Sequence, residues 1–210
     1  MDPRKYDAIY KTTPPEKIPW NLEEPPETLV NLVKSGTVKP CRTIDLGCGT
    51  GNYAVYLAGL GFDVTGVDGS PTAIEMARKN AAKHGAKCTF LVANLLGDMH
   101  EVPGKFQFGF EWDLLHQFFP EVRETYAKNV ASVLEPGAVY VSVSFGESDP
   151  HFGGKGKVRT SPMDTTLYFS SEDEVRDLFS SYFNVKECKT ITIAGKWAPH
   201  EAVYFLGVRK

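Results

Sequence analysis

The sequence lacks three features that each mark a class of protein. Only four cysteines occur among 210 residues and none form a C-x-x-C pair, so neither a disulfide framework nor a zinc site is indicated. No apolar run approaches the ~18 residues of a membrane-spanning helix. Acidic and basic residues nearly cancel to a net charge of −3, which provides no footprint for nucleic acid or an anionic membrane. We therefore expect no metal, no nucleic-acid partner, no membrane attachment and a cytoplasmic location.

A hydrophobic content of 42% supports one domain with a sizeable core. Changes in composition and in the hydrophobic pattern divide the chain into four parts. These are an N-terminal arm with a short helix (1–40), a core (41–145), a mobile loop (146–170), and a C-terminal helix with a β-hairpin (171–210).

Prolines interrupt the arm repeatedly and leave room for one short helix, Glu27 to Ser35. Tyr6, Tyr10 and Trp20 are then expected on irregular chain. They either anchor the arm to the domain or close over a bound ligand and exclude water.

From Arg42 onward, short β-type runs alternate with helix-length segments, which is typical of a parallel α/β sheet. The predicted strands are 43–46, 63–68, 88–92, 106–111, 138–145, 183–189 and 201–208. The predicted helices are 52–60, 71–84, 121–133 and one that begins after Ser171.

A glycine-rich turn, Asp45-Leu46-Gly47-Cys48-Gly49-Thr50-Gly51, follows the first of these strands. Glycine lets the backbone approach a ligand closely, and the helix behind the turn offers free N–H groups to a polar or anionic group. The spacing is G-x-G-x-G instead of the G-x-G-x-x-G of dinucleotide folds, which disfavours NAD. At the end of the second strand, Asp68 can accept hydrogen bonds from both hydroxyls of a ribose.

These segments, together with Val64 to Pro71 and Leu134-Glu135-Pro136-Gly137, resemble the class I S-adenosylmethionine-dependent methyltransferases. The resemblance covers about Arg42 to Phe145. It implies a doubly wound, Rossmann-like α/β fold: a seven-stranded, mostly parallel sheet, with the last strand antiparallel and helices on both faces. It also implies S-adenosyl-L-methionine as cofactor, with its methionine part on the glycine loop and its ribose on Asp68.

The predicted cofactor-binding residues lie at the strand ends and in the arm. They are Trp20, Asp45, Gly47, Cys48, Gly49, Asp68, Gly69, Ser70, Asn94, Leu95, Glu111 and Trp112. Asn94 stands where the family usually has an aspartate that receives the adenine amino group. Its side chain either fills that role or caps the loop as an Asx turn.

His116 follows the fourth strand and is the candidate catalytic base, with Asp113 placed to orient its imidazole. Alternatively, His116 is a structural residue packed under Phe118 and Phe119, and a thiol acceptor needs no base. Pro19-Trp20 and Glu111 to His116 resemble most the small-molecule methyltransferases of the thiol, thiopurine and tellurite-resistance type. No [ND]-P-P-[FYW] follows the fourth strand, which disfavours the amino-group methylases of adenine and glutamine.

The sequence therefore predicts a methyltransferase for a small acceptor: a thiol, amine, hydroxyl or metalloid. Lys155, Lys157 and Arg159 in the loop would favour an anionic acceptor. Three alternatives remain open. They are a methyltransferase acting on protein or RNA, an NAD-dependent oxidoreductase, and a cofactor-binding subunit without catalysis of its own.

Overall fold

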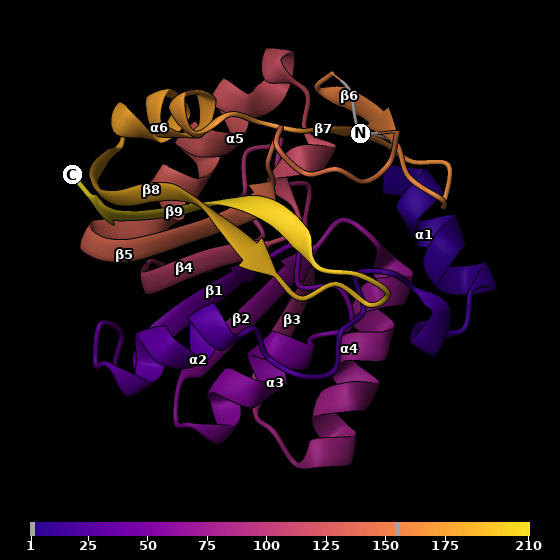
Figure 1. Cartoon of the computed structure of the whole chain (residues 1–210). Helices are drawn as coiled ribbons and strands as arrows, with labels where there is room; N and C mark the ends of the chain where they lie inside the picture. The colour runs from indigo at the N-terminus through magenta and orange to yellow at the C-terminus, as the bar shows by residue number, and fades with distance from the viewer. Residues whose placement is uncertain (1–2, 154–155) are drawn as a thin grey trace.

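A seven-stranded sheet forms the centre of the computed structural model, which describes residues 3–153 and 156–210 (Figure 1). The strand order is β3-β2-β1-β4-β5-β9-β8, and β9 runs antiparallel to both its neighbours while the other pairs are parallel. The strands are β1 (Arg42–Leu46), β2 (Asp63–Asp68), β3 (Cys88–Val92), β4 (Phe106–Trp112), β5 (Leu134–Phe145), β8 (Phe183–Ile193) and β9 (His200–Arg209). The predicted fold class is confirmed.

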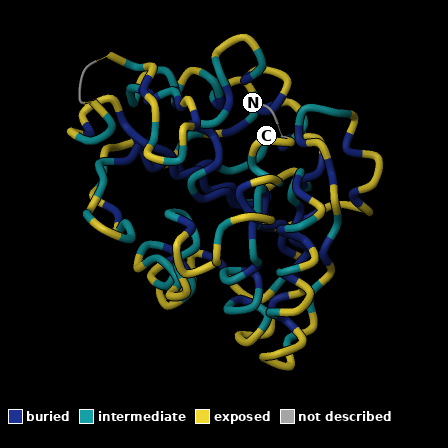
Figure 2. The backbone as a smooth tube through the Cα atoms, turned by 90° about the vertical axis from the view of Figure 1, so that its right-hand side faces the viewer, coloured by how far each residue is buried: buried dark blue, intermediate teal, exposed yellow. Residues whose placement is uncertain are grey.

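Helices cover both faces of the sheet (Figure 1). On one face lie α2 (Glu27–Lys34), α3 (Asn52–Gly59) and α4 (Pro71–His84), and on the other α5 (Pro120–Val133) and α6 (Glu172–Ser180). Side chains alternate along β9, so that Val203 and Phe205 join the core under α5 and α6 while Tyr204 joins the opposite core. The central strands β1, β4, β5 and β9 are mostly buried, at the dark-blue centre of Figure 2, whereas most residues of the edge strand β8 are exposed or half-buried.

Local sequence signals account for the helix ends. The Ser70 hydroxyl accepts a hydrogen bond from the Ala73 N–H at 3.1 Å and Pro71 opens α4, which ends before Gly85 in the left-handed conformation. Ser171 and Glu174 form a reciprocal capping box at the start of α6. Both features agree with the sequence prediction.

The arm contains more helix than the sequence predicted. Tyr6 and Tyr10 lie on α1 (Pro3–Thr12), so their expected placement on irregular chain is wrong. No proline interrupts the chain between Pro3 and Pro14, which leaves room for three turns. Trp20 does lie on irregular chain, after the 3₁₀ turn η1 (Pro15–Lys17).

The segment 146–170, predicted as a mobile loop, contains a two-stranded hairpin formed by β6 (Val158–Thr160) and β7 (Thr166–Tyr168). Lys155 of the predicted basic cluster lies outside the described residues. Within residues 3–153 and 156–210, no helix has the length and apolar character needed to cross a membrane.

Candidate active site

Two adjoining cavities open at the carboxyl ends of the parallel strands, where open α/β sheets bind their ligands. The first, of about 330 Å³, lies over the glycine loop. Every predicted cofactor-binding residue except Glu111 lines it. The second, of about 730 Å³, lies beside it under the β8–β9 connection.

The glycine loop is tied to Asp68. One carboxylate oxygen of Asp68 accepts a hydrogen bond from the Gly49 N–H at 3.0 Å and the other from the Ser70 N–H at 2.8 Å. Gly49 has a φ of +52°, and a Cβ there would lie 2.8 Å from the Tyr10 hydroxyl. The backbone therefore passes closer to the arm than a side chain would allow.

Two carboxylates in the first cavity have buried oxygens without a hydrogen-bond partner in the described chain. Asp45 is 3% exposed, and burial, with Asp68 and Glu111 nearby, raises its pKa well above the usual range. Asp113 has a φ of +61°, and burial raises its pKa to about 7. Unpaired buried carboxylates are costly, so this cavity is suited to a ligand that carries positive charge.

Glu111 does not line the first cavity, contrary to its predicted role there. Its side chain is fully buried, and one carboxylate oxygen accepts hydrogen bonds from the N–H groups of Leu114 (2.9 Å) and Leu115 (3.2 Å). The other accepts the Ser142 hydroxyl. Successive side chains on a strand point to opposite faces, so Glu111 and Trp112 of β4 cannot both face the cavity.

Asn94 forms the Asx turn that the sequence left as one alternative, because its Oδ1 accepts a hydrogen bond from the Leu96 N–H at 3.1 Å. The residue also lines the first cavity, next to Leu95.

The arm forms one wall of the first cavity and meets the glycine loop at Gly49. Tyr6, Tyr10 and Trp20 contribute its wall, and the Trp20 indole N–H donates to the Tyr10 hydroxyl at 2.8 Å. Sequence analysis missed two further residues of this wall, Asn21 and Leu22. The Asn52 side chain donates to the side-chain oxygen of Asn21 at 3.0 Å and to the carbonyl of Leu22 at 2.8 Å, but no sequence motif joins these positions.

The second cavity shares Tyr6, Trp20, Leu22, Asp113 and Gln117 with the first. Aromatic side chains make up about a third of the rest of its wall. They include Phe145, Phe152, Trp197 and the imidazoles of His116, His151 and His200.

His116 lies on η2 (Leu115–Gln117) and is 4% exposed. Its ring stacks on Phe145 at 4.3 Å between centroids, and its Nδ1 accepts the Phe145 N–H at 3.4 Å. Burial, together with Arg123 and His200, lowers its pKa to about 3. Among the described residues no hydrogen bond joins it to Asp113, so the predicted orienting contact is not formed.

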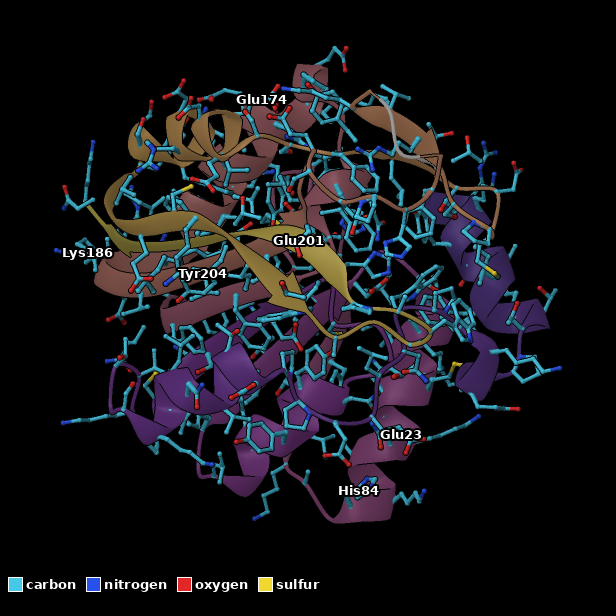
Figure 3. All side chains as sticks on the ribbon, in the orientation of Figure 1. Glu23, His84, Glu174, Lys186, Glu201 and Tyr204 are labelled. Carbon is cyan, nitrogen blue, oxygen red and sulfur yellow. The ribbon has the colours of Figure 1, made fainter. Side chains whose placement is uncertain are left out.

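The two basic side chains of the 146–170 segment that the structure describes, Lys157 and Arg159, are engaged within the protein. Lys157 pairs with Glu147 at 3.3 Å and with Glu174 of α6 at 2.7 Å, at the top of Figure 3. Arg159 is buried and donates to backbone carbonyls. Neither lines the second cavity, so the expected attraction of an anionic acceptor by these two charges is wrong.

Residues 44–137 match a family model described as a methyltransferase domain. The core of the chain is thus a methyltransferase domain, and the chain is similar to S-adenosylmethionine-dependent methyltransferases. A solved structure described as "Conversion of a Disulfide Bond into a Thioacetal Group during Echinomycin Biosynthesis" superposes on this methyltransferase with a TM-score of 0.84 at 28% identity. That match covers 100% of this chain and 93% of the other.

Two curated relatives extend the similarity beyond the core of this methyltransferase. The 2-heptyl-1-hydroxyquinolin-4(1H)-one methyltransferase of Mycobacteroides abscessus is 29% identical over 87% of this chain and 77% of its own. A probable thiol methyltransferase of Arabidopsis thaliana is 28% identical over 71% of this chain and 66% of its own.

Proposed function

We propose that this methyltransferase transfers the methyl group of S-adenosylmethionine to a small aromatic or heteroaromatic acceptor. The observation that carries the proposal is the pair of adjoining cavities, which share Asp113, Trp20 and Gln117. The first has the glycine loop and unpaired carboxylates, and the second has an aromatic wall. Methyl transfer is an in-line displacement, so the protein's main task is to hold donor and acceptor in line and exclude water.

S-adenosylmethionine fits the first cavity by charge. It carries an ammonium and a sulfonium, and Asp45 and Asp113 each offer a buried oxygen without a partner. Asp68 keeps lone pairs beyond its two backbone hydrogen bonds for the ribose hydroxyls. Trp20, Gly47, Cys48, Gly49, Gly69, Ser70, Asn94, Leu95 and Trp112 would complete the wall. When bound, the cofactor supplies an activated methyl group.

Asp113 and His116 would serve the acceptor side. Asp113 lines both cavities, which suits it to hold the positive end of the donor against the acceptor. His116 lines only the second cavity, and a pKa of about 3 makes it a weak proton acceptor at neutral pH. It therefore supports the wall and offers one neutral ring to the acceptor, which was the alternative to its predicted role as base.

Two kinds of observation support a small aromatic acceptor. The second cavity lies within the size range of small-molecule sites and has Phe145, Phe152 and Trp197 in its wall. Two relatives are named for a hydroxyquinolone and a thiol. Both kinds of group present a nucleophilic atom on a small molecule.

The test is transfer of a labelled methyl group from S-adenosylmethionine to a panel of small acceptors: a hydroxyquinolone, a phenol, an aromatic thiol and an aromatic amine. We expect label in at least one of them and the release of S-adenosylhomocysteine. Label found only in added protein or RNA would overturn the proposal in favour of a macromolecular acceptor.

A further inference from the structure

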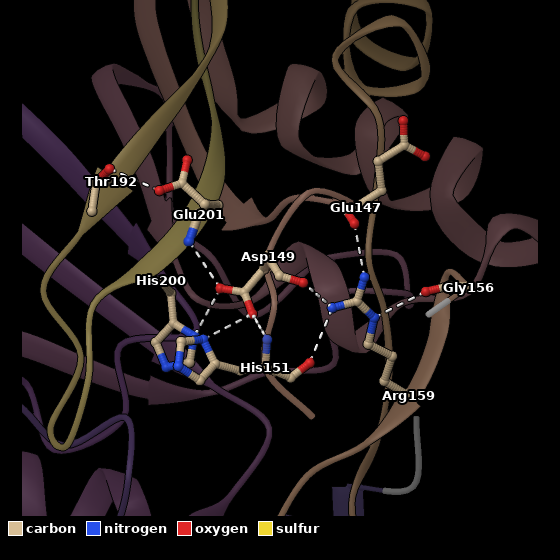
Figure 4. Close-up of polar contacts among 8 residues, drawn as sticks. All are labelled: Glu147, Asp149, His151, Gly156, Arg159, Thr192, His200 and Glu201. Carbon is tan, nitrogen blue, oxygen red and sulfur yellow. Dashed lines mark hydrogen bonds and ion pairs between the residues drawn. The ribbon is translucent and has the colours of Figure 1, made fainter. Parts of the chain in front are cut away.

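The second cavity contains a group of side chains to which the proposed function assigns no role. Asp149, His151 and His200 lie together where the chain after β5 meets the start of β9 (Figure 4). Both imidazoles line the cavity. The inference that follows rests on the proposed small-molecule acceptor and identifies which group receives its proton.

Asp149 is held rigidly. Its side chain has no exposed surface, and its Oδ1 accepts a hydrogen bond from the His151 N–H at 2.7 Å. Its Oδ2 accepts two more, from the Glu201 N–H at 2.8 Å and from Nδ1 of His200 at 2.9 Å. A buried carboxylate fixed in this way favours a positive charge on the ring that it contacts.

Arg159 fixes the backbone that carries Asp149. Its buried guanidinium donates to the carbonyls of Glu147 (2.8 Å), Gly156 (2.9 Å) and His151 (3.0 Å), and to that of Asp149 itself. None of these partners is a carboxylate. Arg159 therefore holds the backbone of Asp149, while the side-chain contact of the carboxylate is with His200.

The His200 side chain lines the second cavity, and only one of its two ring nitrogens contacts Asp149. Because Nδ1 faces the Asp149 carboxylate, that contact assigns the ring proton to Nδ1 and leaves a lone pair on Nε2. The side chain is 15% exposed and packs against both Phe145 and Phe152, with ring centroids at 4.8 and 5.4 Å. Gly195 packs closely against the His200 ring. A Cβ at position 195 would lie only 3.0 Å from Nε2, so a larger residue would crowd the imidazole.

We infer that His200 is the proton acceptor for methyl transfer, and that Asp149 is the positioning residue that orients the ring and stabilises its protonated form. As the acceptor heteroatom bonds to the methyl carbon, its proton passes to Nε2 of His200. The donor sulfur keeps the electron pair of the broken C–S bond, and His200 then releases the proton to water. The acceptor class is a neutral O–H or N–H group, such as a phenol or N-hydroxy heterocycle, that must lose a proton to react.

The neighbouring histidines are less suited to this role. Nδ1 of His151 lies 3.3 Å from Asp149 but makes no hydrogen bond to it. Among the described residues, no carboxylate makes a hydrogen bond to His116, whose Nδ1 accepts a backbone N–H instead. The same side chains, Asp149, His151 and His200, could instead bind a divalent cation. The test below separates cation binding from proton acceptance by His200.

The test uses 4-nitrophenol, whose anion absorbs at longer wavelength than the neutral phenol. It is titrated into the full chain loaded with S-adenosylhomocysteine, in buffer with EDTA, at a pH where the free phenol is mostly protonated. We expect the bound probe to appear as its anion in the wild type. We expect H200Q to lose this signal, D149N to retain only part of it, and any methylation of the probe to fall by about 100-fold in H200Q.

The matched control is H84Q, which changes an exposed histidine at the far end of α4 (Figure 3) and should leave the signal intact. Calorimetry with S-adenosylhomocysteine and thermal unfolding on the same samples check that each variant is folded and keeps its cofactor cavity. The anion signal persisting in folded H200Q, or vanishing in H116Q or H151Q but not in H200Q, overturns the inference. The inference is also overturned if the wild type gives no anion signal, or if the anion signal appears only when Zn²⁺ is added and EDTA is left out. Failure of the panel assay with an intact anion signal would instead count against the proposed function.

Discussion

The two cavities are built in different ways. The first is formed mainly by short segments that follow β1, β2, β3 and β4, all within the residues that match the methyltransferase family. The second is formed mainly by the arm, the 146–170 segment and the β8–β9 connection, which are distant from one another in sequence, and a few core residues after β4 and at the end of β5 complete it. Cofactor recognition is thus local to the core of the fold, whereas acceptor recognition depends on its additions.

The cavities also differ in charge. Asp45 and Asp68 line only the first, whereas the second has aromatic rings, imidazoles and Lys196 beside the shared Asp113. A cation fits the first, and a flat neutral molecule that releases a proton fits the second. Variants that damage one cavity and spare the other can therefore test this division.

The largest effect is expected for Asp68→Ala. It removes the carboxylate proposed to accept hydrogen bonds from the two ribose hydroxyls, and affinity for S-adenosylhomocysteine should fall by about 100-fold. Binding of 4-nitrophenol to the second cavity should change far less. Calorimetry measures both, and Asp63→Ala, an exposed residue at the start of the same strand, is the control. An unchanged cofactor affinity would remove Asp68 from the ribose.

Gly49→Ala should disturb both cavities, because a Cβ at φ +52° would meet the Tyr10 hydroxyl at 2.8 Å. We expect the free energy of unfolding to fall by about 2 kcal/mol in urea titrations. Gly59→Ala is the matched control, since a Cβ there meets nothing within 4 Å and α3 should gain about 0.5 kcal/mol. Equal effects of the two changes would contradict the close approach of the arm.

Asp113→Asn should alter how stability depends on pH. Burial raises the pKa of Asp113 from 3.8 to about 7, so the folded state binds more protons than the unfolded state between these values. Wild-type stability should therefore fall as pH rises through this window and level off above it. The variant, which cannot ionise, should be more stable than the wild type above the window by an amount on the order of 1 kcal/mol.

The same variant should bind S-adenosylmethionine less well relative to S-adenosylhomocysteine, because only the former carries the sulfonium charge. Asp63→Asn, at an exposed position, should change neither the pH profile nor this ratio. If Asp113→Asn leaves the ratio unaltered, Asp113 does not face the donor sulfur.

The smallest effect is expected for Lys196→Met. The Lys196 ammonium of the β8–β9 connection donates to the carbonyls of Ile18 (3.0 Å) and Asn21 (3.1 Å), and so ties the connection to the arm. Its loss should speed hydrogen exchange in residues 18–22 and weaken binding in both cavities about threefold. Lys186→Met, at the other end of β8 (Figure 3), is the control. Faster exchange in both variants alike would contradict the tie.

The fold and the first cavity could be predicted because their signals are contiguous. The glycine loop, Asp68 and the caps of α4 each occupy a few consecutive residues, and parallel strands bring their carboxyl ends together. Asp149 and His200 lie 51 residues apart, on a turn and a strand start that only the folded chain joins. Strand alternation places the side chains of Glu111 and Trp112 on opposite faces of β4, and only Trp112 lines the first cavity. Asn21 joins the wall of that cavity through a contact with Asn52 that no local sequence pattern predicts.

Tyr6 and Trp20 belong to the walls of both cavities. A ligand in one cavity therefore touches the same two rings as a ligand in the other. If a bound donor changes the affinity for the acceptor through these rings, thermodynamic reciprocity requires the acceptor to change the affinity for the donor by the same factor.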